Sequence, residues 1–517
     1  MHKAKLAVLF TLLFSGAGLA QAADLTIGLA SSTTSMDPQF YVGGANSAMA
    51  RNLFDGLVNQ DATQKITPAL AVSWQTVNDK TWRFKLRPGV KFHDGSPLTA
   101  NDVVASIKRV ALAAKSSPSA YTPYVADIAD AKAIDPMTVE IVTRSPAALL
   151  LNNLSRIAIM PARLEHTPSS TLNEGKDVIG TGPFKFVSWT PDDQVVLARN
   201  DQYWGEKAQW DKVVLKLYKN SSARVAALLS GDVDMIEAVP SADGKTLAGK
   251  DTLRMVTVPG NRVLYLHPDQ DRDRSPFASG ADGTNPLRKL EVRQAMSLAI
   301  NRQAIVDRIL DGQGMPASQL VPQGYFGYSA AVPDAKYDPQ QAKQLLAKAG
   351  YPKGFSLTFH ASNDRYPNDA RVAQALGQMF NRIGINTNVV TMPGSVYFSR
   401  AAKRDFSLVM GGAADETGEA SGVLGPLLET FGPNAGQGNR GRYSNAQFDR
   451  LLNQARSTLD NGQREKLLQQ ATDLAMQQQG VIPVLFFSNS WAMKKQYQYQ
   501  GRSDGYTLPY YVRSADK

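Results

Sequence analysis

Residues Thr81 to Ser106 read TWRFKLRPGVKFHDGSPLTANDVVAS, and they carry the clearest structural pattern in the chain. Apolar and basic residues alternate over 82–87, which is typical of a half-buried strand. Pro88-Gly89 predicts a turn. The alternation resumes over 90–92 and ends at a second predicted turn, Asp94-Gly95.

A helix is predicted directly after this second turn. Thr99, followed three residues later by Asp102, is typical of an N-cap residue and its N3 partner. Val103, Val104 and Ile107 then supply the apolar side of the helix. The spacing alone fits any supersecondary unit of strand, turn, strand, turn and capped helix.

The residue identities are more specific than the spacing. From Trp82 to Val103 the chain reads W-x-F-x-L-R-x-G-V-K-F-H-D-G-x-P-x-T-A-x-D-V. This pattern resembles the signature of the family 5 extracellular solute-binding proteins, the dipeptide-, oligopeptide- and nickel-binding components of ABC importers. Four further segments fit the family, so that the resemblance covers essentially the whole mature chain: G-T-G-P-F at Gly180–Phe184, N-x-x-Y-W at Asn200–Trp204, L-x-x-G-x-V-D at Leu228–Asp234 and P-L-x-x-x-x-V-R-Q-A-x-x-x-A-I-N-R at Pro286–Arg302.

The resemblance implies an α/β, two-lobed periplasmic-binding-protein fold of the type II kind. An extra subdomain is inserted in the first lobe, and two crossing strands form the hinge. On that reading the chain leaves the first lobe near Gly260 and returns near Val481–Ser488, and the lobes close around a ligand by hinge bending. The expected division is a signal peptide at 1–22, lobe I at 23–60, 176–260 and 485–517, the inserted subdomain at 61–175, and lobe II at 261–484.

Length and patterning agree with several domains of mixed structure. A chain of 517 residues exceeds what one hydrophobic core normally supports. After about residue 260, predicted helices at 339–349 and 369–383 alternate with predicted strands at 357–359 and 385–390. Such βαβ alternation indicates a substantially parallel sheet.

The N-terminus predicts export. Lys3 and Lys5 precede the apolar run Leu6–Phe14, and Ala20-Gln21-Ala22 offers the small residues of a signal-peptidase site. The run is too short to span a bilayer, and no later segment approaches the roughly 20 apolar residues of a span. The chain has no cysteine and hence no lipobox cysteine, which favours a free protein in a Gram-negative periplasm.

Charge and composition argue against nucleic-acid binding. The net charge of +10 becomes +8 when Lys3 and Lys5 of the predicted signal are subtracted. Basic residues are scattered, and the longest basic clusters are pairs such as Lys494-Lys495. A solvated, mildly basic surface is therefore favoured over a nucleic-acid face, and a monomer is expected.

Enzyme motifs occur in the wrong context. Gly501–Gly505 fits G-x-S-x-G, but no buried strand precedes it, no helix can follow it, and no histidine lies downstream. Gly436–Gly441 fits G-x-G-x-x-G without the preceding strand of a dinucleotide site, which favours a glycine-rich loop. The histidines are widely separated, with no metal-ligand spacing. We expect no catalytic residue, no metal and no cofactor.

A peptide ligand would bring two charged ends into the protein. Enclosing them costs several kcal/mol each unless a carboxylate meets the amine and a guanidinium meets the carboxylate. In dipeptide-binding members of the family, the amine-binding aspartate lies in a glycine-bearing loop after a strand. Here residues 406–410 match the strand and 411–415 the loop, so the resemblance points to Asp415. The family's carboxylate-binding arginine is matched by Arg371, within Pro367–Arg371.

Three other residues complete the expected ligand site. Gly412 stands near the position where dipeptide receptors usually carry tryptophan, which predicts a wider pocket. Glu419 stands where the second aspartate would be, and this extra acid adds negative charge to the site. Ser35, in the loop after the first predicted strand, is a further candidate. For Asp415 and Arg371, a helix-cap carboxylate and a surface helix charge remain the alternatives.

The resulting hypothesis is a periplasmic receptor without chemistry of its own, which captures a small peptide-like solute and delivers it to an ABC permease and ATPase complex. The departures from the dipeptide pattern leave other ligands open: an opine, a glutathione-like compound, a sugar derivative, or a nickel or haem chelate. A secreted hydrolase, and a periplasmic chaperone or adhesion module, are the alternatives from other classes.

Overall fold

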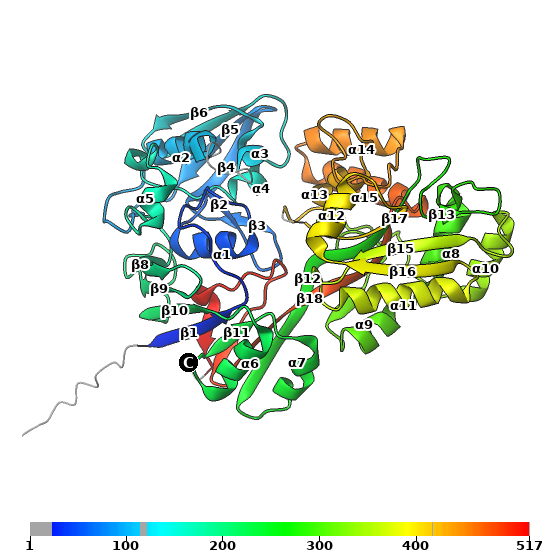
Figure 1. The fold of residues 1–517 in the computed structure, drawn as a ribbon. Coiled ribbons are helices and arrows are strands. Elements are labelled where there is room, and N and C mark those ends of the chain that lie inside the picture. The colour runs from blue at the N-terminus through cyan, green and yellow to red at the C-terminus, as the bar shows by residue number, and fades with distance from the viewer. Residues whose placement is uncertain (1–22, 114–120, 416, 516–517) are drawn as a thin grey trace, which may run out of the picture.

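The computed structural model describes residues 23–113, 121–415 and 417–515 (Figure 1). The predicted signal segment, 1–22, lies outside these residues. Figure 1 shows two lobes joined by a pair of long strands, which confirms the two-lobed α/β prediction. None of the helices in the described part of the chain has the length and apolar character needed to cross a bilayer.

The strands and helices fall along the chain as follows. The strands are β1 Asp24–Leu29, β2 Val58–Gln60, β3 Ile66–Pro68, β4 Ala71–Asn78, β5 Thr81–Leu86, β6 Ile128–Asp135, β7 Thr138–Thr143, β8 Phe184–Thr190, β9 Gln194–Arg199, β10 Lys212–Leu217, β11 Met235–Glu237, β12 Leu253–Pro268, β13 Ala278–Ser279, β14 Gly314–Pro316, β15 Ser356–Ser362, β16 Asn386–Met392, β17 Leu408–Ala414, β18 Ile482–Lys494, β19 Tyr497–Tyr499 and β20 Val512–Ser514. The α-helices are α1 Gly44–Leu53, α2 Ala100–Ala113, α3 Thr122–Val125, α4 Leu150–Leu154, α5 Ser169–Asn173, α6 Ser221–Ser230, α7 Ser241–Ala248, α8 Leu290–Ala299, α9 Arg302–Ile309, α10 Pro339–Lys348, α11 Asp369–Arg382, α12 Gly394–Ala402, α13 Ser421–Leu428, α14 Ala446–Ser457 and α15 Asn461–Gln477.

One sheet runs through both lobes, in the order β13-β15-β17-β12-β18-β11-β1-β10-β9-β8. Its first-lobe part combines parallel pairing of β1 with β10 and β11 and antiparallel pairing of β8 with β9. In its second-lobe part, β15 is parallel to both β16 and β17. The carboxyl ends of these three strands therefore lie at one edge, where ligands bind in open α/β sheets.

The hinge is the antiparallel pair β12 and β18, which Figure 1 shows passing from one lobe to the other. Their pairing is interrupted by a register shift between Pro259 and Val263, at the predicted crossing point. Gly260 is needed there because a Cβ atom would lie 2.5 Å from the carbonyl oxygen of Phe487. The backbones of the two strands thus approach closely where they cross.

The opening segment of the sequence analysis forms the core of the inserted subdomain. β5 lies in a separate antiparallel sheet, β4-β5-β7-β6, and buries Trp82, Phe84 and Leu86 against α2. Burial of each of these side chains contributes about 1.5–3 kcal/mol. The carboxylate of Asp102 accepts hydrogen bonds from the backbone N–H and the hydroxyl of Thr99, at 2.7 and 2.8 Å, so the predicted helix cap is present.

Residues 90–92 do not form the second strand that the alternation predicted. They are held by a tight turn, in which Phe92 N–H donates to Ser96 O at 2.8 Å and Leu98 N–H donates to Val90 O at 3.0 Å. An isolated antiparallel bridge joins Lys91 to Pro97. Val90 and Phe92 are buried nonetheless, because the turn packs against the core of the subdomain.

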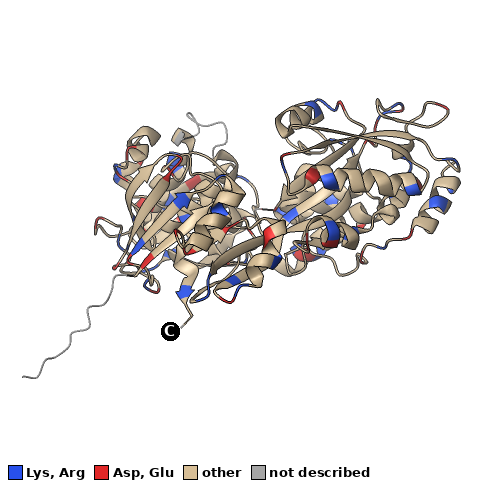
Figure 2. Ribbon diagram, turned by 60° about the horizontal axis from the view of Figure 1, so that its bottom comes forward, with Lys and Arg blue, Asp and Glu red and all other residues tan. Residues whose placement is uncertain are grey.

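His93 joins two of the segments that resemble the family. Its ring nitrogens contact Gly182 O at 3.1 Å and Gly180 N at 3.2 Å, so this histidine has a structural role. Burial lowers its pKa to about 4, which keeps the ring neutral at physiological pH. Figure 2 shows basic and acidic residues interspersed over both lobes, without a basic stripe in that view.

Candidate functional site

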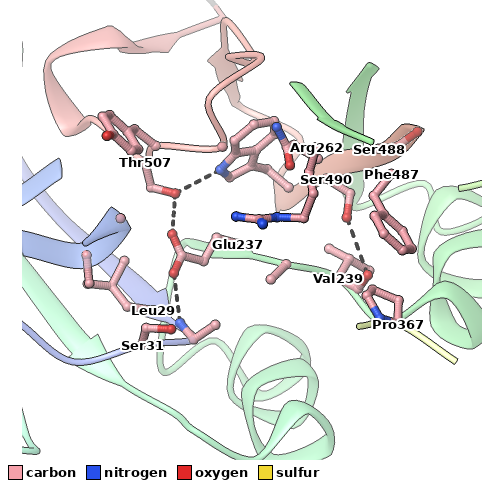
Figure 3. Close-up of a pocket in the computed structure, with 18 of the residues that line it drawn as sticks. Leu29, Ser31, Glu237, Val239, Arg262, Pro367, Phe487, Ser488, Ser490 and Thr507 are labelled. Atoms are coloured by element: carbon pink, nitrogen blue, oxygen red, sulfur yellow. Dashed lines mark hydrogen bonds between the residues drawn. The ribbon is translucent and has the colours of Figure 1, made fainter. Parts of the chain in front are cut away.

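A cavity of about 600 Å³ lies beside the hinge and is lined by both lobes (Figure 3). We call it the hinge cavity. Its walls come from the ends of β1 and β11, from the middle of β18, from α1, from the C-terminal segment around Thr507, and from the loop between β15 and α11. The volume is typical of sites for small solutes.

The acids of this cavity are already paired within the protein. Glu237 accepts hydrogen bonds from Ala30 N–H at 2.8 Å and from the hydroxyl of Thr507, which Figure 3 shows side by side with it. Burial raises the pKa of Glu237. Asp504 forms an ion pair with Arg502 at 2.7 Å. Both carboxyl groups therefore shape the wall and leave little acceptor capacity for a ligand.

The loop between β15 and α11 brings an arginine and a tyrosine into the cavity. One carboxyl oxygen of the buried Asp369 accepts the hydroxyl of Ser362 at 2.7 Å and the backbone N–H groups of Arg365 and Tyr366 at 3.0 and 3.2 Å. These bonds fix the loop at the start of the helix. The Arg365 side chain remains exposed, and Arg262, from β12, lines the same cavity. Two guanidinium groups therefore lie on this wall.

Asp415, the predicted amine ligand, directly follows β17 and is completely buried. Its Oδ1 accepts hydrogen bonds from the N–H and the hydroxyl of Thr417, at 2.9 and 2.7 Å. Its Oδ2 has no hydrogen-bond partner among the described residues. Burial raises the pKa of Asp415 to about 7, and the negative charge of Glu419 adds to the effect, against the two bonds from Thr417.

Gly412, on β17, does not widen the pocket as the sequence predicted. The ring of Tyr366 covers it, and an ideal Cβ on Gly412 would lie 2.6 Å from that ring. Gly412 N–H donates to the Tyr366 hydroxyl at 2.8 Å, and the ring stacks on Phe487 at a centroid distance of 6.0 Å. The aromatic group that the loop lacks is thus supplied by another element.

The other predicted residues have different surroundings. Glu419 is buried in an ion pair with Arg464 and accepts the hydroxyl of Ser421. Ser35 is buried, and its hydroxyl donates to Asn173 at 2.8 Å. Arg371 is exposed in the first turn of α11. None of the five predicted residues is among the residues that line the hinge cavity. Gly412, Asp415 and Glu419 lie on one continuous segment of the chain.

Sequence reasoning missed Arg365 and Tyr366. The available signal was their place in the loop after a strand parallel to β17, since neighbouring parallel strands deliver their following loops to the same edge. What the sequence could not give is that Asp369 turns this loop toward the hinge. Arg371 lies only six residues further on, but it faces solvent from the helix.

The G-x-S-x-G segment does not have the contacts of a catalytic serine. Ser503, in the G-x-S-x-G segment, donates to Ala62 O at 3.1 Å and accepts from the Tyr325 hydroxyl at 2.6 Å, and no histidine is among these contacts. Within the described ranges, no group of three or more histidine or acidic side chains could hold a metal ion. Two lobes, a crossing-strand hinge and a cavity between them define a solute-binding protein.

Comparison with known proteins identifies the family. Residues 65–435 match the family model described as bacterial extracellular solute-binding proteins, family 5, middle region. The chain belongs to this family, whose members are the substrate-binding proteins of ABC importers.

Its relatives differ in the ligands that their names state. The chain is 30% identical to the glutathione-binding protein GsiB of Pectobacterium atrosepticum, over 87% of this chain and 86% of the relative. It is 29% identical to heme-binding protein A of Haemophilus influenzae, over 86% and 83%, and to the dipeptide-binding protein of Escherichia coli, over 84% of each. These relatives are binding proteins rather than enzymes.

Solved structures show the same fold. HbpA2 from Haemophilus parasuis aligns with a TM-score of 0.81 at 24% identity, covering 95% of this chain and 99% of that one. DppA from Helicobacter pylori, in complex with the peptide STSA, aligns with a TM-score of 0.75 at 24% identity, covering 95% and 98%.

Proposed function

We propose that this protein is a periplasmic receptor that captures a small peptide-like solute between its lobes and delivers it to an inner-membrane ABC permease and ATPase. The signal-peptide pattern and the family support the compartment and the partner. The protein acts as a monomer and leaves its ligand chemically unchanged. An affinity near micromolar, about −8 kcal/mol, is sufficient for capture and still allows release.

One observation carries the peptide part of this proposal. A buried carboxyl oxygen without a partner, on Asp415, and an exposed guanidinium, on Arg365, lie in the loops that follow neighbouring parallel strands. The ammonium of a peptide meets the first group, and its carboxylate meets the second in the hinge cavity. Arg262 adds positive charge on the same side.

Calorimetry with Ala-Ala and its N-acetylated and C-amidated forms tests the assignment. Each blocked end should weaken binding by at least about tenfold, since an enclosed charge loses its partner. Asp415→Ala should remove the discrimination against the acetylated form, and Arg365→Ala the discrimination against the amide.

Arg371→Ala is the matched comparison variant for binding of the ligand carboxylate. The sequence pattern favours Arg371, whereas the lining of the hinge cavity favours Arg365. We therefore expect Arg365→Ala, but not Arg371→Ala, to remove the discrimination against the amide. Equal affinity for free and blocked dipeptides would refute end-group recognition. Recovery of hydrolysed Ala-Ala, detected by mass spectrometry, would refute a pure binding role.

Another ligand class would give a different result. Of the alternatives, a glutathione-like compound fits a cavity wall that carries two arginines, because it bears more than one carboxylate. A site of this kind would bind glutathione and would bind Ala-Ala only poorly. Competition between glutathione and Ala-Ala in the same titration distinguishes the two ligand classes.

A further inference from the structure

The G-x-S-x-G segment, Gly501–Gly505, forms a tight turn that contacts both lobes and the hinge strands. It lies between β19 and β20, and Gly505 N–H donates to Arg502 O at 3.1 Å. Gly505 has a φ of +76°, a backbone conformation that favours glycine. We call this segment the C-terminal turn.

Hydrogen bonds to the segment after β2 fix the C-terminal turn to lobe I. The guanidinium of the buried Arg502 donates to Gln60 O at 3.3 Å and to Asp61 O at 3.2 Å. Ala62 O accepts both the backbone N–H and the hydroxyl of Ser503, at 3.0 and 3.1 Å. Because these bonds come from two successive residues of the turn, the turn moves together with this lobe.

The same turn binds the hinge strands where they cross. Ser503 O accepts the backbone N–H of Asn261 at 3.0 Å and the side-chain amide of Asn489 at 2.9 Å. Asn261 lies within the register shift of β12 between Pro259 and Val263, and Asn489 lies on β18. A change in the angle between the lobes must therefore displace the turn or break these bonds.

Lobe II reaches the C-terminal turn through Tyr325. Its ring is 7% exposed and packs in a core cluster of lobe II, and its hydroxyl donates to Ser503 Oγ at 2.6 Å. Burial raises the pKa of Tyr325, which keeps the hydroxyl protonated as a donor. The hydroxyl of Ser503 thus donates to lobe I, at Ala62, and accepts from lobe II.

Tyr325 is also connected to the loop that follows β17. The neighbouring Phe326 accepts Ala420 N–H at its carbonyl oxygen at 2.8 Å, and it forms an isolated parallel bridge with Glu419. The backbone of 325–326 is therefore held against the end of the loop that carries the proposed ammonium-binding carboxyl group. Printed contacts run without a break from this loop through Tyr325 to Ser503 and the crossing point of the hinge.

We propose that Ser503 and Tyr325 form a latch that stabilises the closed arrangement of the lobes and connects the loop after β17 to the hinge. Neither residue lines the hinge cavity, so both are positioning residues. Opening of the lobes must break their hydrogen bond, which therefore adds to the stability of the closed arrangement. The inference goes beyond the proposed function, because it applies to any ligand around which the lobes close.

Tyr325→Phe and Ser503→Ala each remove the latch hydrogen bond and test the inference. Small-angle scattering of each ligand-free variant should give a larger radius of gyration than that of the parent. The dissociation rate of Ala-Ala should rise about two- to tenfold, as loss of one hydrogen bond implies. The double variant should release Ala-Ala no faster than Ser503→Ala, since both changes remove the same bond. Tyr337→Phe, at an exposed tyrosine of lobe II, is the matched control and should behave as the parent.

The outcomes separate this inference from the peptide assignment. Scattering curves of both variants that superimpose on the parent curve, or effects on dissociation that add in the double variant, would refute the latch. If Ala-Ala does not bind the parent, the peptide assignment fails, and the ligand-free scattering still decides the latch. A lower thermal midpoint with unchanged scattering would show a role in folding alone and would also refute it. Tyr325→Phe keeps the buried ring, so it decides the question if Ser503→Ala does not fold.

Discussion

Asp415 is the residue on which the proposed recognition of a ligand ammonium depends. Its carboxyl group is fully buried, and its pKa is raised by that burial to about 7. In the unfolded chain the same group ionises near pH ~4. A ligand ammonium would stabilise the ionised form, so the empty site holds a carboxyl group whose charge depends on what binds to it.

This shift predicts how stability depends on pH. Below pH ~4 the carboxyl is protonated in both states, and it makes no difference to folding. Between pH ~4 and about 7 the unfolded chain has lost the proton that the folded protein keeps, so the contribution of Asp415 to the free energy of unfolding falls as pH rises. Asp415→Asn should remove this contribution and gain stability relative to the parent across the window. Urea unfolding at pH 4.5, 6 and 8 measures it, and a constant difference at all three would contradict it.

At the residue level, the sequence singled out Asp415 but not Arg365 or Tyr366. Asp415 was singled out by the family resemblance, which matched the strand and the glycine-bearing loop that precede it. Arg365 and Tyr366 could not be predicted, because their position depends on hydrogen bonds to Asp369 and on which strand lies beside β17. The sequence predicted a negative charge at Glu419. It could not predict the ion pair with Arg464, because Arg464 lies on a helix 45 residues further along the chain.

At the scale of elements, the crossing of β12 and β18 depends on Gly260. A Cβ there would lie 2.5 Å from Phe487 O and 3.2 Å from the Asn489 side chain, and a backbone carbonyl cannot move aside as a flexible side chain can. Gly260→Ala should lower the free energy of unfolding by about 1–3 kcal/mol. Gly432→Ala is the matched control, since nothing lies within 4 Å of its Cβ position and its φ is not positive. Equal unfolding midpoints in urea for the two variants would contradict the steric argument.

Elements with strong local signals were predicted best. The capped start of α2 and the N-cap of α10, where Asp338 accepts Gln341 N–H at 2.9 Å, follow from short motifs. The strand expected at 90–92 did not form, because the turn around Gly95 satisfies its backbone locally before another strand can pair with it. The alternation of apolar residues predicted the burial of Val90 and Phe92 correctly, but it predicted strand pairing that is not present.

At the scale of the whole molecule, hydrogen bonds to Thr417 link the two lobes. Two side-chain amides, of Gln60 and Asn152, converge on its carbonyl oxygen from the lobe I side of the gap. Ala148 N–H adds a backbone contact to Arg456 O at 3.1 Å. These contacts join the inserted subdomain of lobe I to lobe II, so their strength biases the balance between open and closed arrangements.

Removing the two amides should therefore shift the empty protein toward a more open arrangement. Each hydrogen bond contributes about 0.5–1.5 kcal/mol, so Gln60→Ala with Asn152→Ala should change the population ratio by roughly tenfold or more. Small-angle scattering of the ligand-free variant should show a larger radius of gyration than the parent, and saturating ligand should bring the two curves together. Arg371→Ala, which removes an exposed side chain of lobe II, is the control and should leave the scattering unchanged. Superimposable curves for the double variant and the parent would show that the hinge strands, rather than the contacts at Thr417, set the angle between the lobes.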